Sequence, residues 1–127
     1  MLSYLLVFLG AGLGGALRHA LNLACARALG TSFPWGTVVI NVTGSLCMGL
    51  IAGFFAFKAG VGWSQHTRLF LTTGILGGYT TFSTFSLEVV LLWERGEMGL
   101  AALYVFGSVG LGVAGLMSGL WLIRSLA

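Results

Sequence analysis

The segment from Thr72 to Ser86 contains the residues best suited to handling an ion. It holds five threonines, two serines and three glycines within a stretch that has no charged residue. Hydroxyl groups can both donate and accept hydrogen bonds, so a row of them could replace water around a small ion. Gly77 and Gly78 each weaken a helix by roughly 1 kcal/mol relative to alanine. These features predict a helix break near Gly77-Gly78, and the alternative is a helix made flexible for packing.

Phe82 and Phe85 follow this expected break and share one helix face, because they are spaced i, i+3. Two such rings are ordinarily core residues. Ser83 and Thr84 accompany them, however, and an aromatic ring has a positive edge. Ring edges beside hydroxyl donors favour a small anion over a cation, so the pairing points to a halide.

Further polar residues stand inside apolar stretches. Asn41 offers an amide donor, although it could equally bond a neighbouring helix, and Tyr104 and Ser108 share a face at i, i+4 spacing. Glu88 follows the Phe pair by one turn and costs about 2.5–3.5 kcal/mol if charged at the bilayer centre. Arg18 is the cation most suited to face a vestibule and attract anions.

The elements that must position these residues are membrane helices. Of 127 residues, 57% are hydrophobic and 7% charged, and mean hydropathy is +1.00. A soluble domain has about 25% charged residues, so a water-soluble enzyme and a disordered tail are excluded. Uncharged stretches predict a single all-α transmembrane domain over 1–127, in the cell membrane, with spans at roughly 2–28, 35–57, 66–93 and 98–124. The expected connections include 30–34, which holds Pro34, and 60–64.

The charges predict little preference for one orientation. With four spans, Lys58, Arg68 and Arg124 fall on one side of the membrane, and Arg27 and Arg95 fall on the other. Orientation depends on a Lys/Arg excess in cytoplasmic loops, so this balance favours insertion both ways and an antiparallel dimer. One further arginine could instead select a single topology. The six basic residues are also too scattered for nucleic-acid binding.

Enzyme motifs lack their required context. Residues 10–15 satisfy G-x-G-x-x-G formally, but a dinucleotide site needs a preceding strand and a later acidic residue, and the chain has no Asp. No serine can be matched with a base and an orienting group for hydrolysis. The chain is therefore not expected to be an enzyme.

The string Gly74-x-x-Gly77-Gly78-x-Thr80-Thr81-Phe82-Ser83-Thr84-Phe85-Ser86-x-Glu88 closely resembles the signature of the Fluc/CrcB family of fluoride channels. Gly15-Ala16-Leu17-Arg18 and Gly36-Thr37-x-x-x-Asn41-x-x-Gly44 are also similar to that family. The matching segments touch three of the four expected spans. One departure is Gly112, because some relatives carry a hydroxyl there.

The resemblance implies passive fluoride export through two pores of an antiparallel, dual-topology homodimer. Phe82 and Phe85 would contact fluoride, and Asn41 would be a pore-lining donor. The resemblance also implies further members of a polar track, namely Ser83, Thr84, Tyr104, Ser108 and Thr37. Glu88 and Arg18 would lie toward the vestibules, and the backbone carbonyls of Gly77 and Thr80 would hold a structural sodium ion shared by both subunits.

Two rival functions fit the size of the chain. A small four-helix, proton-coupled multidrug transporter can also insert both ways, but it needs a glutamate in its first span, and this span has none. A non-conducting assembly subunit would explain the small residues that recur at four-residue spacing, such as Gly10 with Gly14. It would leave the hydroxyl-rich third span without a purpose.

Overall fold

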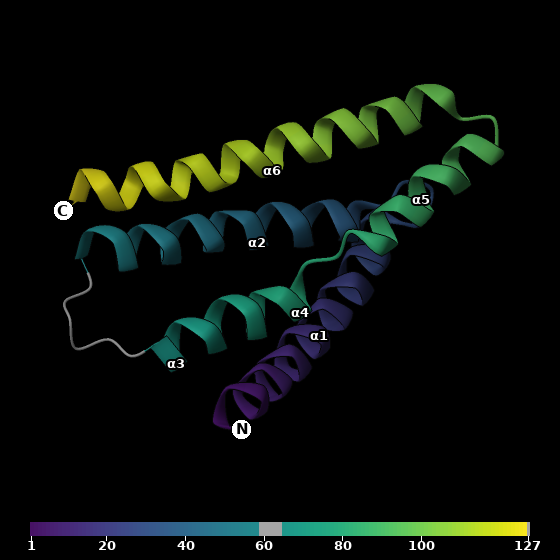
Figure 1. The fold of residues 1–127 in the computed structure, drawn as a ribbon. Helices are drawn as coiled ribbons and strands as arrows, with labels where there is room; N and C mark the ends of the chain where they lie inside the picture. The colour runs from purple at the N-terminus through teal and green to yellow at the C-terminus, as the bar shows by residue number, and fades with distance from the viewer. Residues whose placement is uncertain (59–64, 127) are drawn as a thin grey trace.

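The computed structural model describes residues 1–58 and 65–126, so the predicted connection at 60–64 lies outside the described residues. Figure 1 shows an all-helical chain. Four helical segments of the described part are long and apolar enough to cross a membrane, as predicted, and their ends lie within two residues of the expected ones. The elements are α1 (Leu2–Leu29), α2 (Trp35–Gly53), π-helical η1 (Phe54–Lys58), α3 (Gln65–Leu69), π-helical η2 (Phe70–Leu76), α4 (Gly77–Tyr79), α5 (Ser83–Glu94) and α6 (Met98–Leu126).

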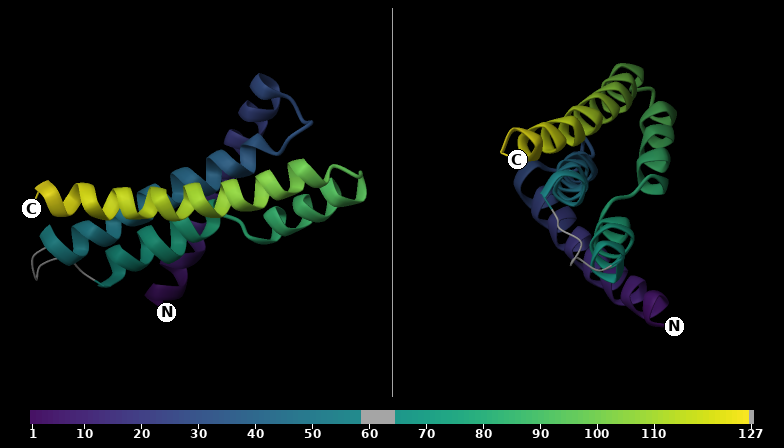
Figure 2. Two further views of the ribbon diagram at one scale, coloured as in Figure 1. Left: turned by 90° about the horizontal axis from the view of Figure 1, so that it is seen from above. Right: turned by 60° about the vertical axis from the view of Figure 1, so that its left-hand side comes forward.

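Helices α2 and α6 run side by side in the same direction, whereas α1 crosses the others obliquely (Figures 1 and 2). Glycines bring the α2 and α6 backbones together. A Cβ atom on Gly119 would come within 2.6 Å of the Leu46 carbonyl oxygen, and one on Gly49 would overlap the Leu116 carbonyl. Lipid supplies no hydrophobic force between helices, so such small-residue contacts provide the packing.

Glycines also seat α1 against the first half of the third span. A Cβ atom on Gly14 would overlap the Ile75 carbonyl, and one on Gly78 would overlap the Ala11 carbonyl. Gly77 and Gly78 both lie within helix α4. The chain leaves the helical conformation only at Thr80, which is extended with φ of −79° and ψ of 158°. The predicted break near Gly77-Gly78 is thus corrected to Thr80–Phe82. Gly78 serves close packing, and it is not where the helix ends.

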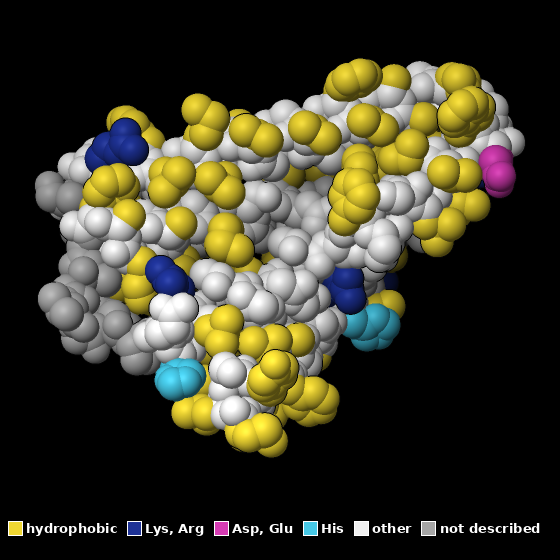
Figure 3. Space-filling model, viewed as in Figure 1, with side chains coloured by type: hydrophobic (Ala, Val, Ile, Leu, Met, Phe, Trp, Pro, Cys, Tyr) yellow, Lys and Arg dark blue, Asp and Glu magenta, His cyan; other side chains and the backbone are white. Residues whose placement is uncertain are grey.

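The exterior is that of a membrane protein. Hydrophobic side chains stand along the whole length of α6 in Figure 3, and acidic side chains appear at the end where α5 and α6 meet. The buried apolar core is small, with one cluster of Ile40, Leu76 and Tyr79 and another of Leu92, Ala101 and Tyr104. The two clusters lie on either side of the break in the third span, and α2 borders both. The fold thus holds the two halves of that span on one supporting helix.

Candidate functional site

The break in the third span is held by a side chain from α2. Asn41 Nδ2 donates to the Thr81 carbonyl oxygen at 3.0 Å, and the Thr81 N–H donates to Asn41 Oδ1 at 2.9 Å. One amide therefore satisfies both backbone groups of the residue at the centre of the break. Irregular backbone at membrane depth requires such partners. The predicted polar residue Asn41 thus contacts the break directly, and this amide keeps one further N–H for another acceptor.

Two backbone carbonyls lose their helical partners at this break. In a continuous helix the Thr81 N–H would bond to the Gly77 carbonyl, and the Thr84 N–H would bond to that of Thr80. The Thr81 N–H instead bonds to Asn41, and the Thr84 N–H bonds to Thr81 Oγ1 at 3.3 Å. Redirecting these two donors leaves the Gly77 and Thr80 oxygens, the pair named from the family resemblance, available to another ligand.

A cleft of about 320 Å³ opens between α2, the break and α6. It is lined by several of the predicted pore residues, among them Asn41, Phe82, Phe85 and Ser108. The two Phe ring centroids lie 5.9 Å apart. Ser108 Oγ is buried and has no hydrogen-bond partner among the described residues, so it remains free to bind something that enters the cleft. The cleft therefore combines aromatic rings with uncommitted donors.

Glu88 joins three helices through one carboxylate oxygen. Thr37 Oγ1 donates to Glu88 Oε1 at 2.7 Å, and the Tyr104 hydroxyl donates to the same atom at 3.0 Å. Both donors are 1% exposed. Hydrogen bonds to a charged group are worth about 1.5–3 kcal/mol each, enough to offset the cost of a carboxylate at this depth. The Tyr104 ring also lies 5.0 Å from that of Phe85, which links this cluster to the cleft.

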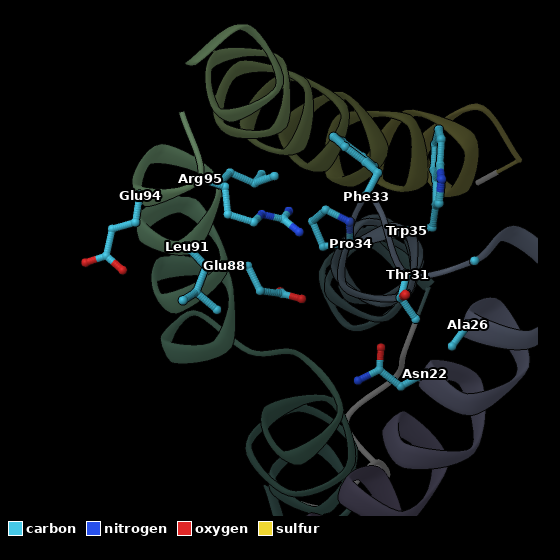
Figure 4. Close-up of a pocket in the computed structure, with 13 residues that line it drawn as sticks. Asn22, Ala26, Thr31, Phe33, Pro34, Trp35, Glu88, Leu91, Glu94 and Arg95 are labelled. Carbon is cyan, nitrogen blue, oxygen red and sulfur yellow. The ribbon is translucent and has the colours of Figure 1, made fainter. Parts of the chain in front are cut away.

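A second pocket, of about 400 Å³, lies at one end of the molecule (Figure 4). Glu88 points into the pocket from α5, and so does Arg95, which directly follows that helix. Asn22 points toward Glu88 and Arg95 from α1, whereas Glu94 points away from the pocket. Glu88 thus lines this pocket, and its expected place at a pore vestibule stays a prediction. Arg18 lines neither this pocket nor the cleft, and the cation that lines the pocket is Arg95.

Some predicted residues stand apart from the cleft of the single chain. Ser83 is exposed at the start of α5, and Thr84 is half-buried beside it, but neither lines the cleft. Conversely, Ser45 was not among the predicted pore residues, but it does line the cleft. The sequence could have indicated this, because Ser45 follows Asn41 by four residues and Thr37 by eight and therefore lies on the same face of α2.

Known proteins are similar to this chain over nearly its whole length. The model of the family described as CrcB-like protein, Camphor Resistance (CrcB), matches residues 5–120. A protein of Rhodopseudomonas palustris (strain BisB5) named "Fluoride-specific ion channel FluC" is 66% identical over 98% of this chain and 99% of its own. A protein of Methylobacterium nodulans with the same name is 64% identical over 98% of this chain and 98% of its own. A protein of Nitrobacter hamburgensis named "Fluoride-specific ion channel FluC 2" is 62% identical over 98% of this chain and 99% of its own. These names describe ion channels and not enzymes. The chain belongs to the CrcB family.

Proposed function

We propose that this chain forms a fluoride-selective channel that exports fluoride passively across the cell membrane and so lowers cytoplasmic fluoride. The observation that carries the proposal is the cleft with its uncommitted donors and paired rings, in a chain up to 66% identical to proteins named fluoride-specific ion channels. The absence of acidic residues from α1 gives the multidrug-transporter alternative no support.

The proposed route starts at the 400 Å³ pocket, passes Glu88, and reaches the cleft by way of Tyr104 and Phe85. Fluoride is small and holds its water strongly, so the route must replace hydration one donor at a time. The Ser108 hydroxyl and the remaining N–H of Asn41 supply donors, and the ring edges of Phe82 and Phe85 add weak positive potential. None of these groups carries a full positive charge, so the ion is not trapped.

The unit that conducts is proposed to be an antiparallel homodimer. Phe82 is 77% exposed in the single chain, and Ser83 and Gly77 are exposed beside the break. Irregular backbone and polar groups do not face lipid in stable membrane proteins. A second copy that covers the break from the opposite orientation would bury these groups, and the nearly even Lys/Arg distribution supports insertion both ways.

A structural sodium ion at the interface between the copies is part of this proposal. The Gly77 and Thr80 carbonyl oxygens fit it, because broken membrane helices present freed carbonyls to sodium ions and both have lost their helical donors. Sodium, when bound, would supply positive charge beside the breaks. Asn41 and Thr81 would keep the carbonyls free by holding the competing N–H groups.

Fluoride efflux from loaded liposomes, measured with a fluoride electrode, tests the function. Wild-type protein should release fluoride rapidly without a proton gradient, and Phe82→Ile and Phe85→Ile should abolish release while the dimer still assembles. Ser118→Ala is the matched control, because the Ser118 hydroxyl is exposed and donates its hydrogen bond within its own helix, to the Ala114 carbonyl oxygen. Undiminished efflux with both Phe variants would refute the role of the rings. Proton-coupled drug uptake or complete silence of the wild type would refute the channel.

Orientation is tested by labelling single cysteines from outside cells. Cys25 and Cys47 are first replaced, and Ser32→Cys or Gln65→Cys is introduced, because both positions are exposed and lie at opposite ends of α2 and η1. Dual insertion predicts that an impermeant reagent labels about half of each variant. Complete labelling of one and none of the other would contradict an antiparallel dimer.

A further inference from the structure

Two parallel helices carry polar residues at the same heights. On α2 these are Thr37, Asn41 and Ser45, and on α6 the matching positions are Tyr104, Ser108 and Gly112, each set at i, i+4 and i+8. The first level is fixed by the shared Glu88 oxygen. The second is formed by Asn41 and Ser108, which line one cleft. Each level lies about 6 Å from the next along the helix.

The third level has its hydroxyl on α2. Ser45 lines the same cleft as Phe82 and Phe85. A Cβ atom on Gly112 would meet the Ser45 Oγ at 3.6 Å and, apart from its chain neighbours and the nearby backbone of α6, no other heavy atom of the described residues within 4 Å. The Ser45 hydroxyl therefore stands next to open space at position 112, where a larger side chain would compete with it.

This hydroxyl is not committed to its own helix. Membrane serines and threonines often bond the carbonyl one turn earlier, as Thr43, Ser86 and Ser118 do here at 2.6–3.0 Å. The Ser45 hydroxyl makes no hydrogen bond to any residue that the structure describes. In this respect it matches Ser108, the buried and unpartnered hydroxyl one level away.

We infer that Ser45 is a further ion-contacting residue of the conduction path, which donates its hydroxyl to fluoride at the level where α6 has only Gly112. The inference rests on the proposed channel function and extends it. A donor on α2 at this level extends the sequence of donors formed by Asn41 and Ser108 by one helical turn, so a partly dehydrated ion keeps a hydrogen-bond partner there.

The test moves the hydroxyl from one helix to the other. Fluoride efflux from liposomes is measured for wild type, Ser45→Ala, Gly112→Ser and the double variant, with Ser118→Ala as control and size-exclusion chromatography as a check on assembly. Ser45→Ala should lower the rate about ten-fold or more, the size expected for one hydrogen bond to a charged partner. The double variant should recover most of the rate, because a serine at 112 fits and its hydroxyl returns to the same place. Ser118→Ala should conduct like wild type.

Two results would overturn the assignment. One is a Ser45→Ala variant that assembles and conducts at the wild-type rate, and the other is a slow Ser45→Ala variant that Gly112→Ser leaves slow, which would indicate packing. If Ser45→Ala does not assemble, Ser45→Cys keeps the size, loses the strong donor and carries the same prediction. A wild type that releases no fluoride refutes the channel itself, so the two failures are distinguishable.

Discussion

Replacing Asn41 should destabilise the break in the third span before it affects any other part of the fold. Asn41→Leu removes both hydrogen bonds to the Thr81 backbone. At roughly 0.6–1.7 kcal/mol for a hydrogen bond within a membrane protein, the loss is about 1–3 kcal/mol. Asn41→Asp also loses the donor to the Thr81 carbonyl, and its carboxylate adds the cost of a charge within the membrane, about 2.5–3.5 kcal/mol, so it should destabilise the protein at least as much.

The assay compares thermal stability of the purified protein in detergent with fluoride efflux from liposomes. Both variants should be less stable than wild type, and efflux should fall with stability, because Phe82 is itself part of the break. Thr43→Val is the internal control, since the Thr43 side chain bonds to Val39 and Tyr79 and makes no bond to the Thr81 backbone. An Asn41→Leu protein with wild-type stability and efflux would refute the role of Asn41 in holding the break.

Other substitutions test the packing and the carboxylate cluster. Gly14→Ala should destabilise the protein by about 1–3 kcal/mol, because its Cβ would overlap backbone of the third span. Gly12→Ala, with open space around it, should leave stability unchanged or raise it by up to about 1 kcal/mol in the same thermal assay, because alanine favours a helix more than glycine. Equal behaviour of the two variants would contradict the α1 contact. Tyr104→Phe and Thr37→Val should each remove one hydrogen bond to Glu88, worth about 1.5–3 kcal/mol, and reduce fluoride efflux. Full stability and efflux in both would show that the carboxylate does not need these donors.

The sequence determined the class of the protein. Long uncharged stretches bounded by Pro34, Gly96 and scattered charges require membrane helices, since nothing else buries so apolar a chain. The segment around Phe82 and Phe85, which lines the cleft, was also recognisable from the sequence. It carries the family signature, and it is rich in hydroxyl groups, which are unfavourable against lipid.

The position of the break was not predictable from propensity. Gly77 and Gly78 weaken a helix locally, but Gly78 is needed where α1 approaches, and η2 and α4 remain helical up to Tyr79. The chain opens at Thr80–Phe82, where Asn41 supplies substitute hydrogen bonds from 40 residues away. Local propensity contains no information on a partner so distant in sequence.

Residue types alone therefore predicted that this chain crosses a membrane and that the hydroxyl-rich segment is the one suited to handle an ion. The tertiary structure decided which of the polar residues meet. Parallel packing of α2 on α6 brings Thr37 and Tyr104 to one oxygen of Glu88 and sets Ser45 beside Gly112. The physical reason is that helix periodicity fixes the face on which a side chain lies, whereas the register between two helices depends on which small residues let their backbones touch.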